Sequence, residues 1–375
     1  MKDKIKDKLS SEYDLKNIVP MKDGGQSHSF KSYDPILNRD VFVKVYWFSD
    51  KYSDTLLAEP RRLSTLFSSN VNCRKHIANI YDVNKIKIDE DEYLVLQMEY
   101  CGNNHVGDYI SNSGLSIQES INYAKQLCEG LHFLHSVNIL HRDIKPENLI
   151  VNEGICKLID FGSTTMVDEK LDYTKGTSIK TLNYTPPEFF GIDSKYGKYS
   201  DIYQIGVVLH EMLNGRIFIN TDKLSSTLIS RFEKQIGKKY KDFGNWDMSE
   251  FEKKVIEYLS SKNQLLTTFA PTKKHIPNSL TKLIRLITDN EISKRPNSCV
   301  SLRNMLSNIV VPNWKMISES EYTVTKWKDK DYRIKLNLKK ENKWILESAK
   351  HLSSNFKQNH KFDSLDSIIK FINEQ

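Results

Sequence analysis

Hydrophobic residues follow two different periods along this chain, and the change of period separates a strand-rich part from a helical part. Residues 41–45 and 93–98 are short β-rich runs, and residues 13–100 as a whole have the pattern of strands with one leucine-rich helix. Further along, a period close to 3.6 predicts a helix over residues 117–134. A second apolar helix is predicted over residues 201–213, where an Asn-Gly pair ends it. This order predicts an α+β fold in which a β-rich lobe precedes a helical lobe.

The last 65 residues have the pattern of a separate unit. Residues 322–346 contain three predicted strands, and the clearest is the strict alternation of hydrophobic and polar residues at 332–338. A helical face follows, with Asp363 or Ser364 as its N-cap. We therefore predict that residues 311–375 form a small α+β accessory domain of three strands and one helix.

Aromatic residues lie among lysines in this C-terminal unit, as Trp314, Trp327 and Trp344 show. Such a composition can provide stacking surfaces for single-stranded nucleic acid. Aromatic residues in alternating strands are more often core residues, so we interpret these as core. We do not expect a nucleic-acid partner.

Composition and charge are those of an ordinary globular protein. Of the 375 residues, 39% are hydrophobic and 27% are charged, and the net charge is +7. More than half of the excess lies beyond residue 310, where 13 Lys and Arg residues stand against 9 Asp and Glu residues. Five cysteines without paired spacing indicate reduced thiols, and no apolar run is long enough for a membrane span. The sequence predicts a cytoplasmic protein whose residues 1–12 are a flexible N-terminus.

One segment carries most of the chemistry, the run His-Arg-Asp-Ile-Lys-Pro-Glu-Asn at residues 141–148. Asp143 is a carboxylate that can accept a hydroxyl proton, and Lys145 can neutralise a phosphate. Asn148 and Asp160, the first residue of Asp-Phe-Gly, offer the oxygen ligands that Mg²⁺ prefers. Phosphoryl transfer uses groups of these kinds, because in that reaction a protein mainly positions the reactants and stabilises charge.

The two motifs together resemble the catalytic loop and the metal loop of the eukaryotic-like (Hanks-type) serine/threonine protein kinases. The resemblance implies a bilobal fold with an N-lobe at residues 13–100 and a C-lobe at residues 101–310, with ATP and Mg²⁺ bound between the lobes. It implies that Asp143 receives the proton of the acceptor hydroxyl and that Lys145 lies beside the transferring phosphoryl group. The lysine at this place is similar to the serine/threonine branch of the family.

The phosphate-binding lysine is matched by Lys44, because Val-Phe-Val-Lys at residues 41–44 resembles the Val-Ala-Ile-Lys of the third kinase strand. By this match Lys44 grips the α- and β-phosphates, and Glu59 in the following helix is its ion-pair partner. Pro60 fits that helix only in its first turn.

The phosphate-covering loop departs from the family pattern. Only Gly24, with Gly25 beside it, remains of the three glycines that let the backbone approach phosphate closely. Ser29 replaces the valine that packs on adenine, and Phe42 replaces the small alanine facing it. These changes put nucleotide affinity in question, although they leave the transfer chemistry intact.

The segment Met-Glu-Tyr-Cys at residues 98–101 resembles the hinge that links the two lobes. By this resemblance Met98 is the gatekeeper beside adenine. The backbone groups of Glu99 and Cys101 are then expected to bond the edge of the purine.

Residues 181–188 resemble the end of the kinase activation segment, Thr-x-x-Tyr-x-Ala-Pro-Glu. The resemblance implies that Thr181 bridges Asp143 and Lys145. It also implies that Glu188 pairs with Arg295, an ion pair whose loss would leave a buried charge uncompensated.

Two further residues are assigned by the same resemblance. Asp201 is expected to anchor the catalytic loop from the helix below it. Arg142, which precedes the proposed base, marks family members that are switched on by a phosphate in the activation segment. The candidate acceptors are Thr174, Thr177 and Ser178, and we hypothesise autophosphorylation at Thr177 or Ser178.

These features predict a serine/threonine protein kinase that transfers the γ-phosphate of ATP to protein hydroxyls. Two alternatives stay open: a pseudokinase scaffold with weak or no nucleotide turnover, and a small-molecule phosphotransferase of kinase-like fold. The second class generally lacks the Pro187-Glu188 segment and the lysine at Lys145.

The extra length at about 222–272 is interpreted as a helical insertion with its own small core, with a docking surface as the alternative. The sequence does not identify the protein substrate, the activating signal or the oligomeric state.

Overall fold

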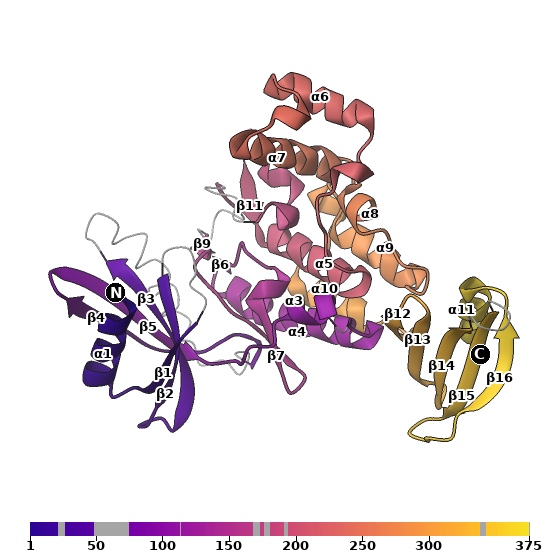
Figure 1. Cartoon of the computed structure of the whole chain (residues 1–375), viewed down its shortest axis with the longest axis horizontal. Helices are drawn as coiled ribbons and strands as arrows, with labels where there is room; N and C mark the ends of the chain where they lie inside the picture. Colours follow the sequence, from indigo (N-terminus) through magenta and orange to yellow (C-terminus); the bar gives the residue numbers. More distant parts are fainter. Residues whose placement is uncertain are drawn as a thin grey trace.

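The computed structural model describes residues 1–21, 27–48, 75–112, 114–167, 173–175, 181–190, 194–337 and 343–374. It has a β-rich lobe, a helical lobe and a C-terminal sheet that follow one another across the molecule (Figure 1). The predicted α+β architecture with two lobes and an additional C-terminal unit is therefore confirmed. Among the described residues, none of the helices combines the length and apolar character that crossing a bilayer requires.

The β-rich lobe is built on one five-stranded antiparallel sheet in the order β1-β2-β3-β5-β4. The two predicted β-rich runs lie in its central strands, β3 and β5, which confirms them as strands. Odd and even positions of β3 face opposite sides of the sheet. Val41, Val43 and Val45 are buried on one side, whereas Phe42 and Lys44 share the other side. The strands span Lys16–Pro20 (β1), Ser27–Asp34 (β2), Arg39–Phe48 (β3), Ile80–Ile88 (β4) and Asp91–Glu99 (β5).

Helix α1 (Lys2–Tyr13) covers the face of this sheet that carries the three valines. Ile5 and Leu9, one turn apart, are both fully buried there. The prediction of a flexible N-terminus at residues 1–12 was therefore wrong. The charged composition of this segment shows no clear helical pattern, because only two of its apolar residues are buried. Two such contacts are enough to hold the helix once the sheet provides the opposite surface.

The helical lobe is centred on α4 and α5, which match the two helices predicted from the 3.6 period. Ser116 and Glu119 form a capping box that fixes the start of α4. Helices α5 and α9 cross closely at Gly206, where a Cβ atom would lie 2.6 Å from side-chain carbons of Ile287 and Thr288. The helices span Val106–Asn112 (α3), Ile117–Ser136 (α4), Lys198–Asn214 (α5), Ser226–Ile236 (α6), Asn245–Ser261 (α7), Leu265–Phe269 (α8), Asn278–Ile287 (α9) and Cys299–Ser307 (α10). Short strands accompany them at Ile139–Leu140 (β6), Leu149–Asn152 (β7), Ile155–Leu158 (β8), Thr165–Met166 (β9), Tyr173–Lys175 (β10) and Lys195–Gly197 (β11).

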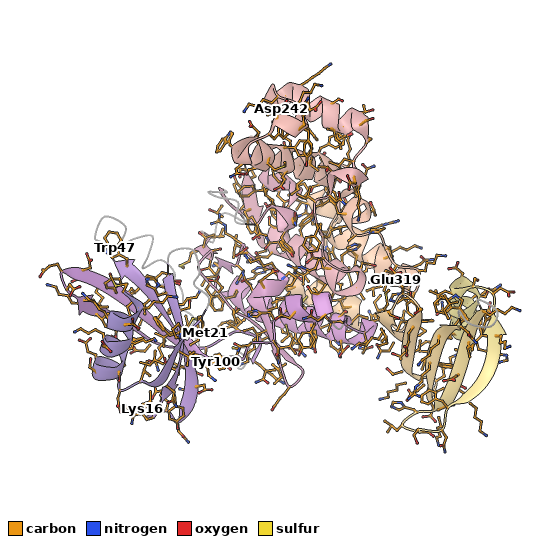
Figure 2. The ribbon with its side chains drawn as sticks, in the orientation of Figure 1. Lys16, Met21, Trp47, Tyr100, Asp242 and Glu319 are labelled. Carbon is orange, nitrogen blue, oxygen red and sulfur yellow. The ribbon has the colours of Figure 1, made fainter. Side chains whose placement is uncertain are left out.

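Helices α6, α7 and α8 occupy the segment interpreted as a helical insertion. Aromatic rings pack where α6 and α7 meet: the ring of Phe251 lies 5.9 Å from that of Phe232 and 5.3 Å from that of Tyr240. Rings at these separations make favourable contacts beyond the area they bury. The rings of this segment thus pack on one another at the end of the molecule where Figure 2 labels Asp242, and they belong to the same hydrophobic core as the helical lobe.

The C-terminal unit is a five-stranded antiparallel sheet in the order of the sequence, with α11 (Leu365–Glu374) packed on one face. The prediction of three strands was too few. The two missed strands are the outer ones, and the last of them, Lys-Gln-Asn-His-Lys-Phe, lacks any hydrophobic alternation. Of the two predicted caps, Ser364 accepts a hydrogen bond from the Ser367 backbone N–H at 3.2 Å. The strands span Asn313–Ser318 (β12), Glu321–Trp327 (β13), Lys330–Asn337 (β14), Lys343–Lys350 (β15) and Lys357–Phe362 (β16).

Strand β12 joins this sheet to the helical lobe. Trp314 is 1% exposed, and its ring centroid lies 6.2 Å from that of His275, which precedes α9. His275 also contacts Tyr322, at 5.2 Å between ring centroids, and the Asn313 side chain accepts a hydrogen bond from the Gln118 backbone N–H. The core of the C-terminal sheet is continuous with that of the helical lobe, which supports the interpretation of these aromatic residues as core.

Candidate active site

The loop between β6 and β7 carries the His-Arg-Asp motif and is held from below by Asp201 on α5. This carboxylate is fully buried and accepts hydrogen bonds from the backbone N–H groups of His141 and Arg142, at 3.0 and 2.9 Å. The His135 ring and the Tyr196 hydroxyl donate to the same carboxylate, at 2.8 and 2.9 Å. Arg142 has a φ of 71°, a left-handed conformation that is costly for a residue other than glycine. Asp201 therefore fixes the loop in a strained shape.

The electrostatics of Asp201 follow from these contacts. Burial acts to raise the pKa of a carboxyl group, because it disfavours the charged form. The hydrogen bond and charge of His135 and the two backbone donors outweigh burial, so the pKa of Asp201 lies below its ordinary value. The side chain is an anion at neutral pH, as an acceptor of four hydrogen bonds should be.

Asp143, Lys145, Thr181 and Asn148 form one hydrogen-bonded cluster. The Lys145 ammonium donates to both oxygens of Asp143, at 3.1 and 2.9 Å, and to the Thr181 hydroxyl at 3.1 Å. Thr181 in turn donates to Asp143 at 3.4 Å. The Asn148 amide nitrogen donates to the backbone carbonyl and to the carboxylate of Asp143, at 2.7 and 3.1 Å. Both contacts use the amide nitrogen of Asn148, and neither uses its amide oxygen.

Lys44 and Asp160 bring the two lobes together although 116 residues separate them in sequence. The Lys44 ammonium lies 2.9 Å from the Asp160 carboxylate. The lysine side chain is 12% exposed and the aspartate side chain 41% exposed, so the pair lies at a partly open position. Phe161 is fully buried and packs edge-on against the His141 ring at 5.7 Å, which ties the Asp-Phe-Gly segment to the catalytic loop.

The hinge residues lie where β5 leaves the β-rich lobe. Met98 is 3% exposed and stands opposite Phe42 in the register of β3 and β5. The Glu99 carboxylate is held by the Lys157 ammonium and by Asn79, whose side chain donates to it at 2.8 Å. Figure 2 shows the next residue, Tyr100, between the two lobes. Burial raises the pKa of the Cys101 thiol to about 12, so this thiol is neutral at physiological pH.

The two departures from the family pattern near adenine both lie on the sheet face that carries Lys44. Ser29 is buried, at 2% exposure, and pairs with Lys44 across β2 and β3. Phe42 is half-buried and packs against the main hydrophobic core. Part of the Phe42 ring is therefore packed against neighbouring residues on the sheet face that carries Lys44.

The end of the activation segment is anchored by a bidentate ion pair. Arg295 donates to the two oxygens of Glu188 at 2.9 and 2.8 Å, and their side chains are 0% and 9% exposed. Ser200 adds a hydrogen bond to Glu188 at 2.7 Å, and Arg295 also donates to the Asp289 carbonyl at 2.7 Å. Every polar atom of this pair is thus partnered, the condition under which a buried ion pair is tolerated.

Thr174 lies in β10, directly opposite Tyr196 of β11. The Arg142 guanidinium is 5.7 Å from the centroid of the Tyr196 ring. Thr174 and Arg142 are therefore both neighbours of Tyr196.

Five predicted site residues lie outside the described residues. They are Gly24, Gly25, Glu59, Thr177 and Ser178.

Sequence reasoning missed two residues that organise this site. Gln204 accepts a hydrogen bond from the Ile144 backbone N–H at 2.9 Å and donates to the Tyr184 carbonyl at 3.2 Å, so it joins the catalytic loop to the activation segment. His135 donates to Asp201. Gln204 follows Asp201 by three residues on one helix face, and this spacing was a usable signal. His135 carried no comparable signal, because it looks like any polar residue near a helix end.

The comparisons with known proteins agree with this geometry. The model of the protein kinase domain matches residues 50–307, and the chain belongs to the protein kinase family. The resemblance to the eukaryotic-like serine/threonine kinases is thereby confirmed.

Individual relatives are similar over part of the chain. The serine/threonine-protein kinase PrkC of Bacillus subtilis is 29% identical over 215 residues, which are 56% of this chain and 31% of PrkC. A probable serine/threonine-protein kinase of Clostridium acetobutylicum is 29% identical over 57% of this chain and 32% of its own length. The serine/threonine-protein kinase ppk24 of Schizosaccharomyces pombe is 24% identical over 70% of this chain and 59% of its own length. The chain thus spans about a third of the length of the two bacterial relatives.

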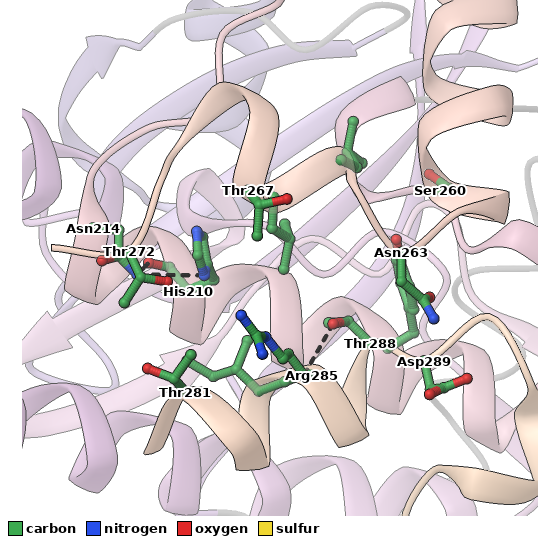
Figure 3. A pocket seen from close by; sticks show the side chains of 14 residues that line it. His210, Asn214, Ser260, Asn263, Thr267, Thr272, Thr281, Arg285, Thr288 and Asp289 are labelled. Carbon is green, nitrogen blue, oxygen red and sulfur yellow. Dashed lines mark hydrogen bonds between the residues drawn. The ribbon is translucent and has the colours of Figure 1, made fainter. Parts of the chain in front are cut away.

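A separate pocket of about 210 Å³ lies in the helical lobe, between α5, α8, α9 and the end of α7 (Figure 3). His210 is one of its lining residues, and burial lowers the pKa of this ring to about 4. Its two ring nitrogens contact the Ala270 carbonyl at 2.6 Å and the Asn214 amide at 3.3 Å, so the neutral ring is held in one tautomer. None of the predicted site residues lines this pocket.

Proposed function

We propose that this chain is a serine/threonine protein kinase that transfers the γ-phosphate of ATP to hydroxyl groups of proteins. The observation that carries the proposal is the cluster of Asp143, Lys145, Asn148 and Thr181 described above. A carboxylate, an ammonium group, an amide and a hydroxyl meet there, and the Lys44–Asp160 pair joins the two lobes.

The residues of the site fit Mg²⁺ and nucleotide phosphates. Asp160 offers carboxylate oxygens, and Asn148 offers an amide oxygen that takes no part in the contacts of its nitrogen with Asp143. Hard oxygen ligands of this kind suit Mg²⁺, which takes one or two protein ligands together with phosphates and water. When bound, the metal would neutralise charge on the β- and γ-phosphates. Lys44, now paired with Asp160, is the group of the β-rich lobe that would hold the α- and β-phosphates.

Asp143 is proposed to orient the acceptor hydroxyl and to receive its proton. Lys145 lies within hydrogen-bond distance of both Asp143 oxygens, so its ammonium is positioned to offset negative charge that develops during transfer. Thr181 contacts both side chains, and it links the activation segment to the base. The order of the activation segment and the geometry of the base are therefore coupled through one hydroxyl.

Activation by phosphate belongs to the same proposal. Arg142 and Thr174 are both neighbours of Tyr196, which supports a role for the activation segment near the catalytic loop. Autophosphorylation at Thr177 or Ser178 stays a prediction, and so does the cytoplasmic location. We also propose the division into a kinase domain at 13–310 and an accessory domain at 311–375, supported by the end of the family match at residue 307.

The two alternative functions make different predictions about turnover. A pseudokinase would bind nucleotide weakly, or bind it without transfer. A small-molecule phosphotransferase would transfer phosphate to a low-molecular-weight alcohol and leave proteins unlabelled. The comparisons give neither alternative support, since the similar proteins named above are serine/threonine-protein kinases.

The test is a transfer assay on the purified chain with labelled ATP, Mg²⁺ and a generic protein substrate. Asp143→Asn should lower turnover by at least about 100-fold, because a positioned base contributes roughly 10²–10⁴-fold. Its fold should be retained, and the matched control Asp242→Asn, an exposed aspartate of the helical insertion, should transfer at the wild-type rate. Equal activity of the Asp143→Asn and Asp242→Asn chains would overturn the assignment of the base.

A further inference from the structure

A hollow of about 380 Å³ lies in the C-terminal sheet, at the ends of β14, β15 and β16. It is outside the region that matches the protein kinase domain, and it is separate from the active site. Four lysines and one aspartate line it, together with a serine and an asparagine. These residues are Lys328, Asp329, Lys330, Ser348, Lys350, Asn355 and Lys357.

The register of the sheet places these lysines on one face. Lys330 of β14 stands directly opposite Lys350 of β15, and Ser348 of β15 stands opposite Lys357 of β16. Lys330 and Tyr332 share a face because they are two residues apart on one strand, as do Lys350 and Ser348. The three ammonium groups therefore project from neighbouring strands on the same side of the sheet as the core residue Tyr332.

Opposed lysines are unfavourable unless an anion lies between them. Residues directly opposite in an antiparallel pair have Cβ atoms about 5 Å apart, and like charges there destabilise the sheet. All three of Lys330, Lys350 and Lys357 are exposed, and in the described parts of the chain no carboxylate lies within ion-pair distance of them. On the same sheet, by contrast, Lys335 pairs with Glu321 at 3.1 Å and Lys343 with Asp363 at 3.8 Å. Lys330, Lys350 and Lys357 are thus set apart, within the described part of the chain, by their lack of a carboxylate at ion-pair distance.

We propose that this hollow binds the phosphate of a phosphorylated serine or threonine carried by an extended peptide segment. A phosphate monoester brings close to two negative charges and three acceptor oxygens, which lysine ammonium groups bind as point charges. It would remove the repulsion between Lys330 and Lys350 and engage Lys357 on the adjacent strand. The choice of phosphate rests on the proposed function, because a serine/threonine kinase produces this group.

The edge of the sheet favours a peptide as the carrier. Strand β16 is the last strand of the sheet, and no described strand pairs with its outer edge, which faces away from the helical lobe (Figure 1). A free strand edge presents backbone N–H and C=O groups that an extended peptide can pair with. Lys357 lies on β16 itself, so a peptide along this edge would bring a phosphorylated side chain beside the hollow.

A nucleic-acid backbone fits the site less well. Recognition of single strands depends on exposed aromatic rings on which bases stack. Trp314 is 1% exposed, and the indole N–H of Trp327 donates to the Ile372 carbonyl at 3.1 Å within the domain. The Trp314 ring is thus enclosed in the core, and the half-buried Trp327 ring packs against that core, so the pair does not form an open stacking surface.

The experiment measures binding of the full-length chain to a fluorescent peptide library with one fixed phosphothreonine, by fluorescence anisotropy at physiological salt. The same library with unmodified threonine, inorganic phosphate as a competitor, and vesicles containing phosphoinositides are the comparison arms. We expect the phosphorylated library to bind at least tenfold more tightly than the unmodified one, and inorganic phosphate to compete.

The double variant Lys330→Gln/Lys350→Gln should weaken phosphopeptide binding at least tenfold. The matched control Lys315→Gln/Lys335→Gln removes the same charge from the opposite face of the sheet and should bind normally. Without a ligand the site variant should melt no lower than the control, since it relieves a repulsion. The single variant Lys357→Gln should also weaken binding.

Three results would overturn the proposal: equal affinity for the two libraries, equal loss in the site and control variants, or binding of vesicles without binding of phosphopeptides. Binding is measured with peptides phosphorylated beforehand and with the Asp143→Asn chain as well. A failure here is therefore distinct from a failure of the proposed kinase activity.

Discussion

Replacing Asp201 by asparagine tests how the catalytic loop is held. The aspartate oxygens accept four hydrogen bonds, two of them from the backbone N–H groups of His141 and Arg142, one on each oxygen. Asparagine keeps one acceptor oxygen and replaces the other with an NH₂ group. The Tyr196 hydroxyl can turn and the His135 ring can change tautomer to accept from that group, whereas a backbone N–H cannot. One backbone donor is therefore left unsatisfied in either orientation of the amide.

The loss in the free energy of unfolding follows from this one unsatisfied backbone donor. A buried unsatisfied donor costs about 1–3 kcal/mol, and the remaining hydrogen bonds lose the strength that the negative charge gives them. We expect Asp201→Asn to lower the free energy of unfolding by about 2–5 kcal/mol. The catalytic loop would then lose one of the two backbone hydrogen bonds that hold it in its strained shape at Arg142, so phosphoryl transfer should fall as well.

Urea unfolding followed by tryptophan fluorescence gives the free energy, and the transfer assay gives the activity. Asp242→Asn is the control, because it makes the same chemical change at an exposed position of the insertion (Figure 2). If the two variants have the same stability, the reasoning about Asp201 is refuted.

Three further predictions concern other parts of the molecule. Leu9→Ala should lower the free energy of unfolding by about 2–5 kcal/mol, because Leu9 is fully buried, and the 43% exposed Leu37→Ala should have little effect in the same urea titration. Burial and the charge of Lys273 lower the pKa of His275 to about 4, below its unfolded value near 6.5, so the unfolded chain binds more protons between these pH values. Stability should thus fall by about 3 kcal/mol more in the wild type than in His275→Gln as the pH drops from 6.5 to 4, and parallel pH profiles would contradict this. Glu188→Gln should cost about 3–5 kcal/mol by leaving Arg295 uncompensated, and adding Arg295→Met should restore part of that loss in a double-mutant cycle.

Local hydrophobic patterns in the sequence predicted many of the strands and helices of this fold. The central strands β3 and β5 were predictable because β-branched and apolar residues fill them, and α4 because its 3.6 period runs over almost the whole helix. Helix α1 was missed for the opposite reason. Only Ile5 and Leu9 of its residues are fully buried, and two apolar residues in a charged segment do not show which surface they cover.

Part of the candidate site could also be predicted from the sequence. Asp143, Lys145 and Asn148 lie within six residues, so chain connectivity alone keeps them close together. The contact between Lys44 and Asp160 spans 116 residues. The family resemblance named both as site residues, with Glu59 as the partner of Lys44 and a metal as that of Asp160, so their direct pairing was not predicted.

Side-chain contacts that depend on the register between two strands could not be predicted from the sequence. Lys330 and Lys350 face each other because β14 and β15 pair in one particular register. A one-residue slip would place them on opposite faces. Nothing in the alternation of residues determines that register, since the connection between the two strands also has to be known.

The most direct test of the central claim is the identification of phosphorylated amino acids after the purified chain is incubated with γ-labelled ATP, Mg²⁺ and protein substrate. The account predicts label on serine or threonine of protein, and at least about 100-fold slower labelling when Asp143 is replaced by asparagine. Binding of ATP without transfer, or label only on a small-molecule alcohol, would contradict it.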